Sequence, residues 1–302
     1  RVFLAVARGE SLSRAGRVLK LDPATVGRRV ARLEGALGVR LFTKSPQGYA
    51  LTDEGARLLS HAQSVETTME TAREAVAGTS AGLTGQIRIG APDGCANYLL
   101  PQVVAAICAG NPGLEVQIVA LPRVFSLNRR EADMVIAVST PDSGRVTVQK
   151  VTDYRLHLAA SPRYLAGAPP LHGLADLGAH RLIGYIPDMI FDRELDYLAD
   201  LGIDAPPLAS NSVSVQLNLI RQGAGLGVVH DFALPFAPGV RRVLTGPFSL
   251  TRAFHLIRHA DDRRVPRLER FARALVSGLR REVVRLERAV EAGGEAGGQH
   301  IL

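Results

Sequence analysis

The residues with the clearest chemical potential are basic side chains that recur at helical spacing shortly after the N-terminus. Arg28, Arg29 and Arg32 follow Thr25 at steps of three, one and three residues. Guanidinium groups bridge phosphates and make paired hydrogen bonds to guanine edges in the major groove of DNA. The chemistry available here is therefore recognition of a nucleic acid, provided that one helix presents these side chains on a single face.

The distribution of charge agrees with this interpretation. Residues 1–52 contain ten Lys or Arg and three acidic residues, so they carry the whole excess of +7, and the rest of the chain is neutral. A basic module on a neutral body is typical of a polyanion binder. Charge alone leaves a merely solvated basic surface as an equal alternative.

Two helices are expected to position the arginines. The first runs over residues 14–20 behind a cap at Ser11 to Ser13, with Ala15, Val18 and Leu19 on its inner face. Asp22 then caps a second helix that has Pro23 at its first position and ends at Gly38. The apolar stripe of this helix, opposite the arginines, comprises Val26, Val30, Leu33 and Leu37.

Two short strands, 39–42 and 49–51, follow and form a hairpin wing with Lys44 near its tip. A short helix, a turn, a longer basic helix and a wing predict a winged helix-turn-helix over residues 1–52. The alternative is a small helical packing module whose charged side chains only face solvent. DNA binding is favoured because the excess of basic residues, the apolar stripe and the predicted wing all fit it. The predicted DNA-binding residues are Ser11, Ser13, Arg14, Asp22, Pro23, Ala24, Thr25, Arg28, Arg29, Arg32 and Lys44.

Residues 11–30, SLSRAGRVLKLDPATVGRRV, followed by ARLEGALGVRLF and YALTDEGARLL, resemble the N-terminal region of LysR-type regulators. The resemblance implies binding to an interrupted inverted repeat of double-stranded DNA, as a homodimer or homotetramer, with RNA polymerase as a further partner. The family's usual Ser-Gln-Pro is replaced by Asp22-Pro23-Ala24, so the familiar glutamine contact to a base is absent. Thr25, Arg28 and Arg29 are the expected substitutes, and the operator sequence stays open.

A connecting helix capped by Thr52 is predicted over residues 53–77, followed by a Gly- and Thr-rich hinge over 78–85. Its apolar residues step by four and three along nearly three heptads: Leu58, Ala62, Val65, Met69, Ala72 and Val76. Such a seam is typical of a helix pair between two subunits, which is also what the resemblance implies. The alternative is a helix packed on its own domain.

Residues 86–292 alternate strand and helix patterns, which predicts open α/β sheets. The expected elements include a helix over 191–201 and a long helix over 265–292, and the Gly-rich tail 293–302 is expected to be disordered. IRIG with Leu99-Leu100-Pro101, the READ turn at 130–133, and IRQGAGLGVV at 220–229 resemble the LysR-type effector domain. That resemblance implies two lobes built like a periplasmic binding protein, lobe I over 86–160 and 252–292 and lobe II over 161–251.

A small organic effector is expected between the lobes, beyond the ends of the strands. The candidate effector-binding residues are Pro92, Asp93, Gly94, Cys95, Arg123, Ser126, Pro187, Asp188, Asn211, Ser212 and Ser214. Arg123 and two expected helix N-termini favour a carboxylate slightly, whereas Asp93 and Asp188 oppose an anion. Helix capping and turn formation are equally good explanations for the Ser and Asn residues.

Other classes of function find less support. A DNA-bound thiol sensor could use Cys95, which lies near an expected helix N-terminus, but a small buried hydrophobe is the favoured interpretation of that residue. No acid/base pair, nucleophile elbow, phosphate loop or metal-ligand spacing points to an enzyme or a cofactor. No membrane span is expected, and two separate cysteines suit a reducing cytoplasm.

Overall fold

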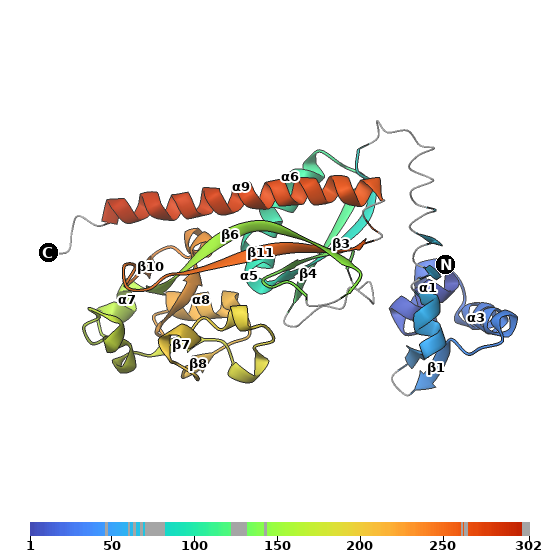
Figure 1. Cartoon of the computed structure of the whole chain (residues 1–302), viewed down its shortest axis with the longest axis horizontal. Helices are drawn as coiled ribbons and strands as arrows, with labels where there is room; N and C mark the ends of the chain where they lie inside the picture. The colour runs from blue at the N-terminus through green and yellow to red at the C-terminus, as the bar shows by residue number, and fades with distance from the viewer. Residues whose placement is uncertain are drawn as a thin grey trace. The chain divides into compact units, whose positions relative to one another are not determined.

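The computed structural model describes residues 1–45, 48–59, 61–62, 65–66, 69, 82–121, 132–141, 144–260, 262 and 265–297. The chain divides into two compact units, one formed mainly by residues 1–81 and the other mainly by residues 82–302 (Figure 1). Each unit has its own core and is described separately below. No helix in the described ranges combines the length and apolar character that crossing a membrane requires.

In the N-terminal unit, the described residues form α1 (Val2–Gly9), α2 (Leu12–Leu19), α3 (Pro23–Leu37) and a hairpin of β1 (Phe42–Ser45) with β2 (Gly48–Leu51), and the connecting helix then begins at Asp53. Its core includes the buried side chains of Phe3, Val6, Val26 and Leu41, and Tyr49 and Leu51 of β2 pack against it. Helix α1 is absent from the sequence prediction. It completes the core that α2 and α3 alone could not close.

The predicted caps are confirmed. The Ser11 hydroxyl accepts a hydrogen bond from Arg14 N at 3.4 Å. One carboxylate oxygen of Asp22 accepts from Ala24 N at 3.0 Å and from Thr25 N at 3.2 Å. These bonds satisfy backbone donors that the first turn of each helix leaves free.

The predicted apolar faces are wrong at two residues. Val18 is 78% exposed and Leu37 is 47% exposed, whereas both were expected to be buried. The turn after α2 packs against Gly16, and the backbone N–H of Leu21 donates to Gly16 O. A Cβ at position 16 would lie only 2.6 Å from Leu21 O. The small residues of α2 therefore face inward and turn Val18 outward.

The wing hairpin begins later than predicted, at Phe42 rather than at position 39, with Lys44 paired to Tyr49 near the turn. Glu34 explains the delay, because its carboxylate accepts from the backbone N–H groups of Leu41 at 2.8 Å and Phe42 at 3.2 Å. Glu34 of α3 thus binds the backbone at Leu41 and at Phe42, the first residue of β1.

The connecting helix is capped as predicted, because Thr52 Oγ1 accepts from Gly55 N at 3.0 Å. The described residues between Asp53 and Met69 are helical. Leu58 and Ala62 pack against the N-terminal core, whereas Val65 and Met69 are 64% and 61% exposed. The remaining seam residues, 72 and 76, and hinge residues 78–81 lie outside the described residues.

The C-terminal unit is built on one nine-stranded mixed sheet with the path β4-β3-β5-β11-β6-β9-β7-β8, and β10 pairs with β6. The strands are β3 (Gly85–Pro92), β4 (Leu114–Leu121), β5 (Met134–Ala137), β6 (Val146–Ala160), β7 (Leu182–Gly184), β8 (Leu208–Ala209), β9 (Leu226–His230), β10 (Arg241–Arg242) and β11 (Leu250–His259). The long antiparallel strands β6 and β11 run from one half of the unit to the other (Figure 1). They therefore link the regions predicted as lobe I and lobe II.

The α-helices of this unit are α5 (Asp93–Tyr98), α6 (Leu100–Ala109), α7 (Pro162–Leu165), α8 (Val213–Arg221) and α9 (Pro266–Gly297). Helix α9 lies along the sheet (Figure 1) and packs tightly on α6, because a Cβ on Gly278 would lie 2.4 Å from Val103 Cγ1. Helix α9 continues through residues 293–297, the first part of the tail that is expected to be disordered, and residues 298–302 lie outside the described residues. Arg155 pairs with Glu287 and Glu291 and so anchors the preceding turns, and no proline follows to end the helix.

The helix predicted over residues 191–201 is also wrong. Two short 3-10 helices occupy this stretch, η4 (Arg193–Leu195) and η5 (Ala199–Leu201). Asp192 accepts a hydrogen bond from Glu194 N, and Asp196 accepts one from Ala199 N. Such local side-chain bonds to the backbone compete with a continuous helix. Three further 3-10 helices are η2 (Leu174–Ala179), η3 (Pro187–Met189) and η6 (Asp231–Phe236).

Candidate DNA-binding surface and effector cleft

The predicted DNA face is exposed on α3. Arg28, Arg29 and Arg32 are all exposed, while Val26 and Val30 of the same helix are buried. The Arg28 guanidinium donates to Thr25 Oγ1 at 3.1 Å, which ties the first arginine to the capped helix start. Within the described part of the chain, none of the three arginines forms a salt bridge. Their charges are therefore available to an external anion.

The other predicted DNA-binding residues surround the start of α3. Asp22, Pro23 and Ala24 are exposed at its N-terminus, as are Ser13 and Arg14 on α2. Ser11 is half-buried because it caps α2, and Lys44 is exposed on the wing hairpin. Asp22 is used for capping, so its carboxylate does not neutralise the arginines that lie one and two turns further along.

In the C-terminal unit, the structure brings together Asp93 at the start of α5 with Ser212 and Ser214 at the start of α8. One carboxylate oxygen of Asp93, Oδ2, accepts from Ser212 Oγ at 2.9 Å, Ser214 N at 3.0 Å and Ser214 Oγ at 3.0 Å. The other oxygen, Oδ1, accepts from Asn97 Nδ2 at 3.0 Å. The three bonds from Ser212 and Ser214 cross from the predicted lobe II to the predicted lobe I, whereas the bond from Asn97 lies within lobe I.

Gly94 and Cys95 lie directly behind this contact. A Cβ on Gly94 would lie 3.1 Å from Val213 Cγ2 and 3.3 Å from His230 Cε1, so a glycine allows α5 to approach the other lobe. Cys95 is fully buried, and burial raises the pKa of its thiol far above the ordinary value. A thiol in this environment is protonated and poorly reactive.

Among the described residues, the other candidates for the cleft form no hydrogen bond with Asp93, Ser212 or Ser214. Pro187 and Asp188 are exposed on η3, and Pro92 and Asn211 are half-buried. Arg123 and Ser126 lie outside the described residues. Effector binding by the whole set stays a prediction.

An aromatic cluster beside Asp93 was missed by the sequence analysis. Tyr154 stacks on Phe254 with ring centroids 4.2 Å apart, and Tyr197 OH lies 3.2 Å from His230 Nε2. These four side chains come from β6, β11, η4 to η5 and β9, and all four are buried. An adjoining cavity of about 10 Å³, lined partly by Tyr185 and Tyr197, has room for about one water molecule. The sequence does show aromatic residues in long strands, which could have indicated buried positions. Which of them contact one another depends on the strand register, which the sequence does not show.

The neutral imidazole of His230 is favoured in the folded protein. Burial lowers its pKa from 6.5 to about 4, although Asp231 and Asp93 oppose the shift. His230 binds a proton more readily in the unfolded chain than in the folded protein. Its contribution to the free energy of unfolding is therefore fully present above pH 6.5 and is lost as pH falls toward 4. We expect a loss on the order of 3 kcal/mol of unfolding free energy across that window.

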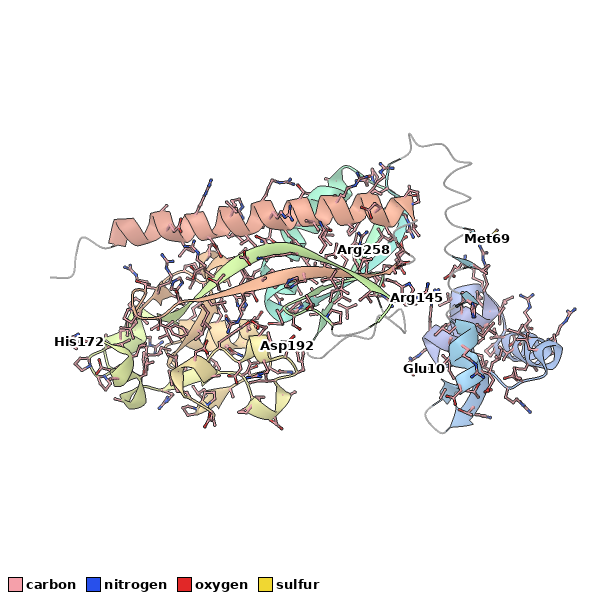
Figure 2. All side chains as sticks on the ribbon, in the orientation of Figure 1. Glu10, Met69, Arg145, His172, Asp192 and Arg258 are labelled. Carbon is pink, nitrogen blue, oxygen red and sulfur yellow. The ribbon has the colours of Figure 1, made fainter. Side chains whose placement is uncertain are left out.

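Thermal melts between pH 7 and 4 measure this effect. His230→Gln should flatten the acid limb of stability against pH, because glutamine does not titrate. His172→Gln is the control, since His172 lies on the surface (Figure 2) and should leave the curve unchanged. An unaltered acid limb in His230→Gln would assign the titration to another group.

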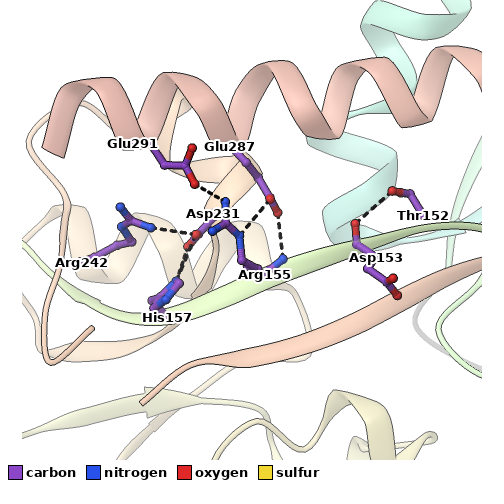
Figure 3. Close-up of polar contacts among 8 residues, drawn as sticks. All are labelled: Thr152, Asp153, Arg155, His157, Asp231, Arg242, Glu287 and Glu291. Atoms are coloured by element: carbon purple, nitrogen blue, oxygen red, sulfur yellow. Dashed lines mark hydrogen bonds and ion pairs between the residues drawn. The ribbon is translucent and has the colours of Figure 1, made fainter. Parts of the chain in front are cut away.

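A cluster of polar side chains around the buried carboxylate of Asp231 lies between β6 and α9 (Figure 3). Asp231 is completely buried; its carboxylate lies 2.8 Å from His157 Nδ1 and accepts from the Arg242 guanidinium at 3.1 Å. Nearby, Arg155 pairs with Glu287 at 3.1 Å and Glu291 at 2.6 Å. In the described parts of the chain, no cluster of three His, Cys, Asp or Glu residues could hold a metal ion. The arrangement is that of a structural ion-pair network.

Comparisons with known proteins agree with both units. A model described as "Bacterial regulatory helix-turn-helix protein, lysR family" matches residues 1–56, and one described as "LysR substrate binding domain" matches residues 80–280. The regulator PtxR of Pseudomonas aeruginosa is 28% identical over 235 residues, covering 76% of this chain and 75% of its own. A probable hydrogen peroxide-inducible genes activator of Mycobacterium avium is 29% identical over 261 residues, covering 83% of each chain.

Solved structures show the same fold. Full-length OxyR from Pseudomonas aeruginosa superposes with a TM-score of 0.70 at 21% identity, covering 93% of this chain and 96% of its own. Full-length LysG from Corynebacterium glutamicum, with bound effector Arg, gives a TM-score of 0.62 at 18% identity, covering 92% and 95%. With a helix-turn-helix followed by a substrate-binding domain, this chain belongs to the LysR family of transcriptional regulators.

Proposed function

We propose that this protein regulates transcription in the cytoplasm by binding an interrupted inverted repeat in double-stranded DNA, and that a small organic effector held between the two lobes controls this binding. The observation that carries the proposal is the exposed, unpaired arginine face of α3 beside a wing that presents Lys44. RNA polymerase is the expected further partner at the promoter.

The direct experiment is selection of bound sequences from a randomised DNA library. We expect enrichment of an inverted repeat and a steep fall of affinity with salt, because each phosphate contact releases counterions. A folded protein that enriches no sequence would contradict the proposal. The enriched operator would also locate the regulated genes.

The effector part of the proposal is supported by the domain match and by the pairing of the two lobes around Asp93, Ser212 and Ser214. LysG shares the fold and was solved with its effector Arg. A thermal-shift screen of metabolites identifies the effector, and operator binding with and without it gives the direction of regulation.

Self-association through the connecting helix is a separate prediction. Val65 and Met69 are exposed at heptad spacing on a helix whose earlier apolar residues pack on the N-terminal core (Figure 2 labels Met69). Met69→Lys places a charge in this seam and should halve the molar mass measured by light scattering. Operator affinity should fall with it, because two half-sites are then bound independently.

The control for this prediction is His61→Lys, which adds the same charge at an exposed position of the same helix outside the seam. It should leave the molar mass and the operator affinity unchanged. A Met69→Lys protein with unaltered molar mass would mean that the helix does not pair through this face.

Peroxide sensing through Cys95 is not proposed, although one relative is named as a peroxide-inducible activator. Cys95 is fully buried, and burial raises its thiol pKa, so the reactive thiolate is suppressed.

A further inference from the structure

The N-terminus of α8 already holds a carboxylate. The first turn of this helix offers a hydroxyl from Ser212 and both a hydroxyl and a backbone N–H from Ser214, and all three donate to Asp93 Oδ2. Three donors at a helix N-terminus form a strong anion-binding arrangement, because the helix dipole adds to the hydrogen bonds. The anion is a side chain of the protein itself.

The contact joins the two lobes. Asp93 begins α5 in lobe I, whereas Ser212 and Ser214 begin α8 in lobe II. A second bond of the same kind joins them elsewhere, because Ser139, which follows β5, donates to the carboxylate of Asp192 in lobe II. Each bond uses a carboxylate of one lobe and a hydroxyl of the other, so side chains of the protein itself join the two lobes.

We propose that Asp93 is a built-in substitute for a ligand carboxylate: it fills the anion-binding position at the start of α8 and holds the effector domain closed with no effector bound. The inference rests on the proposed effector cleft. It also revises the ligand class, because a free carboxylate finds these donors already used. An effector with hydrogen-bond donors at this end can approach Asp93, whereas a carboxylate would have to displace it.

The test is removal of the built-in carboxylate and replacement by a free one. Asp93→Ala leaves the donors of α8 without an acceptor and should lower the melting temperature of the full chain by roughly 5–10 °C. Acetate should restore the lost stability in a saturable manner, because it binds only the folded state. Neither acetamide, nor chloride at equal ionic strength, should do so, and wild type should not respond to acetate.

Two variants control the site. Asp93→Ala combined with Ser212→Ala and Ser214→Ala should lose the acetate response, because both hydroxyl donors are then removed and only the backbone N–H of residue 214 remains. Asp204→Ala removes an exposed carboxylate of lobe II that is not among the predicted cleft residues, and it should neither lower the melting temperature nor create an acetate response. An Asp93→Ala protein that responds to acetate no more than wild type would overturn the proposal.

If Asp93→Ala does not fold, Asp93→Asn and the pair Ser212→Ala with Ser214→Ala provide the same test. Their destabilising effects should be strongly non-additive, since each variant breaks the same bonds. Additive effects would overturn the proposal. All these measurements are made without DNA, so failure of the operator selection and failure of this inference are distinguishable.

Discussion

Replacing Arg28 and Arg29 together by alanine should abolish specific operator binding at physiological salt. A direct contact from each arginine is worth about 1–3 kcal/mol, so the double variant should lose between roughly thirty-fold and ten-thousand-fold in affinity. Both side chains are exposed on α3, and neither contributes to the buried stripe of Val26 and Val30, so the fold should survive. Titration of labelled operator in a gel-shift or anisotropy assay measures the loss.

The single variants separate base contacts from phosphate contacts. A residue that contacts a base should relax the preference at one operator position, whereas a residue on phosphate should weaken all sequences alike and reduce the salt slope by about one. Arg57→Ala is a suitable control, because Arg57 is an exposed arginine on the connecting helix that pairs with Glu54. Wild-type affinity in the folded double variant would rule out α3 as the recognition surface.

Replacing Asp231 by alanine should give the largest loss of stability. The carboxylate is completely buried and is shared by His157 and Arg242, so its removal leaves the partly buried Arg242 guanidinium without its counter-charge. Removing one partner of a buried pair costs about 3–5 kcal/mol, and the partial exposure of Arg242 places the expected loss at the lower end of that range. Urea denaturation of the C-terminal unit should show a lower midpoint with an unchanged slope.

The matched control for Asp231→Ala is Asp204→Ala, an exposed aspartate of the same lobe, which should change the unfolding free energy by less than about 0.5 kcal/mol. Asp231→Asn should be intermediate, because the amide keeps the shape of the carboxylate and loses its charge. Equal stability of Asp231→Ala and wild type would mean that Arg242 and His157 find solvent or other partners.

The features that sequence predicted well depend on neighbours close in the chain. The caps at Ser11, Asp22 and Thr52 each involve a donor two or three residues away, and all three are present. The apolar stripe of α3 held at Val26 and Val30 for the same reason. Exposure of Val18 could not be predicted, because it depends on how the following turn returns onto Gly16.

In the candidate cleft, sequence predicted the positions of some residues but not the contacts between them. Sequence placed Asp93, Ser212 and Ser214 at the cleft from their positions beside strands and helices, but could not indicate that they bind one another across 119 residues of chain. The Asp231 network was missed entirely, because His157 and Arg242 reach Asp231 only through the pairing of β6 with β9 and β10. Long-range pairing of this kind leaves no periodic signal.

The ribbon formed by β6 and β11 has a mechanical consequence. The two strands pair antiparallel along their length, with one register shift between Phe254 and His255. This shift lies beside the stacked rings of Phe254 and Tyr154. A two-stranded ribbon resists stretching through its hydrogen bonds but yields to torsion, and a bulge concentrates the twist at one place. Helix α9 runs alongside these strands and is joined to β6 by the ion pairs of Arg155 with Glu287 and Glu291. We expect any relative movement of the lobes to be a small rotation about the axis of these two strands, resisted at the register shift by the packing of Tyr154 on Phe254.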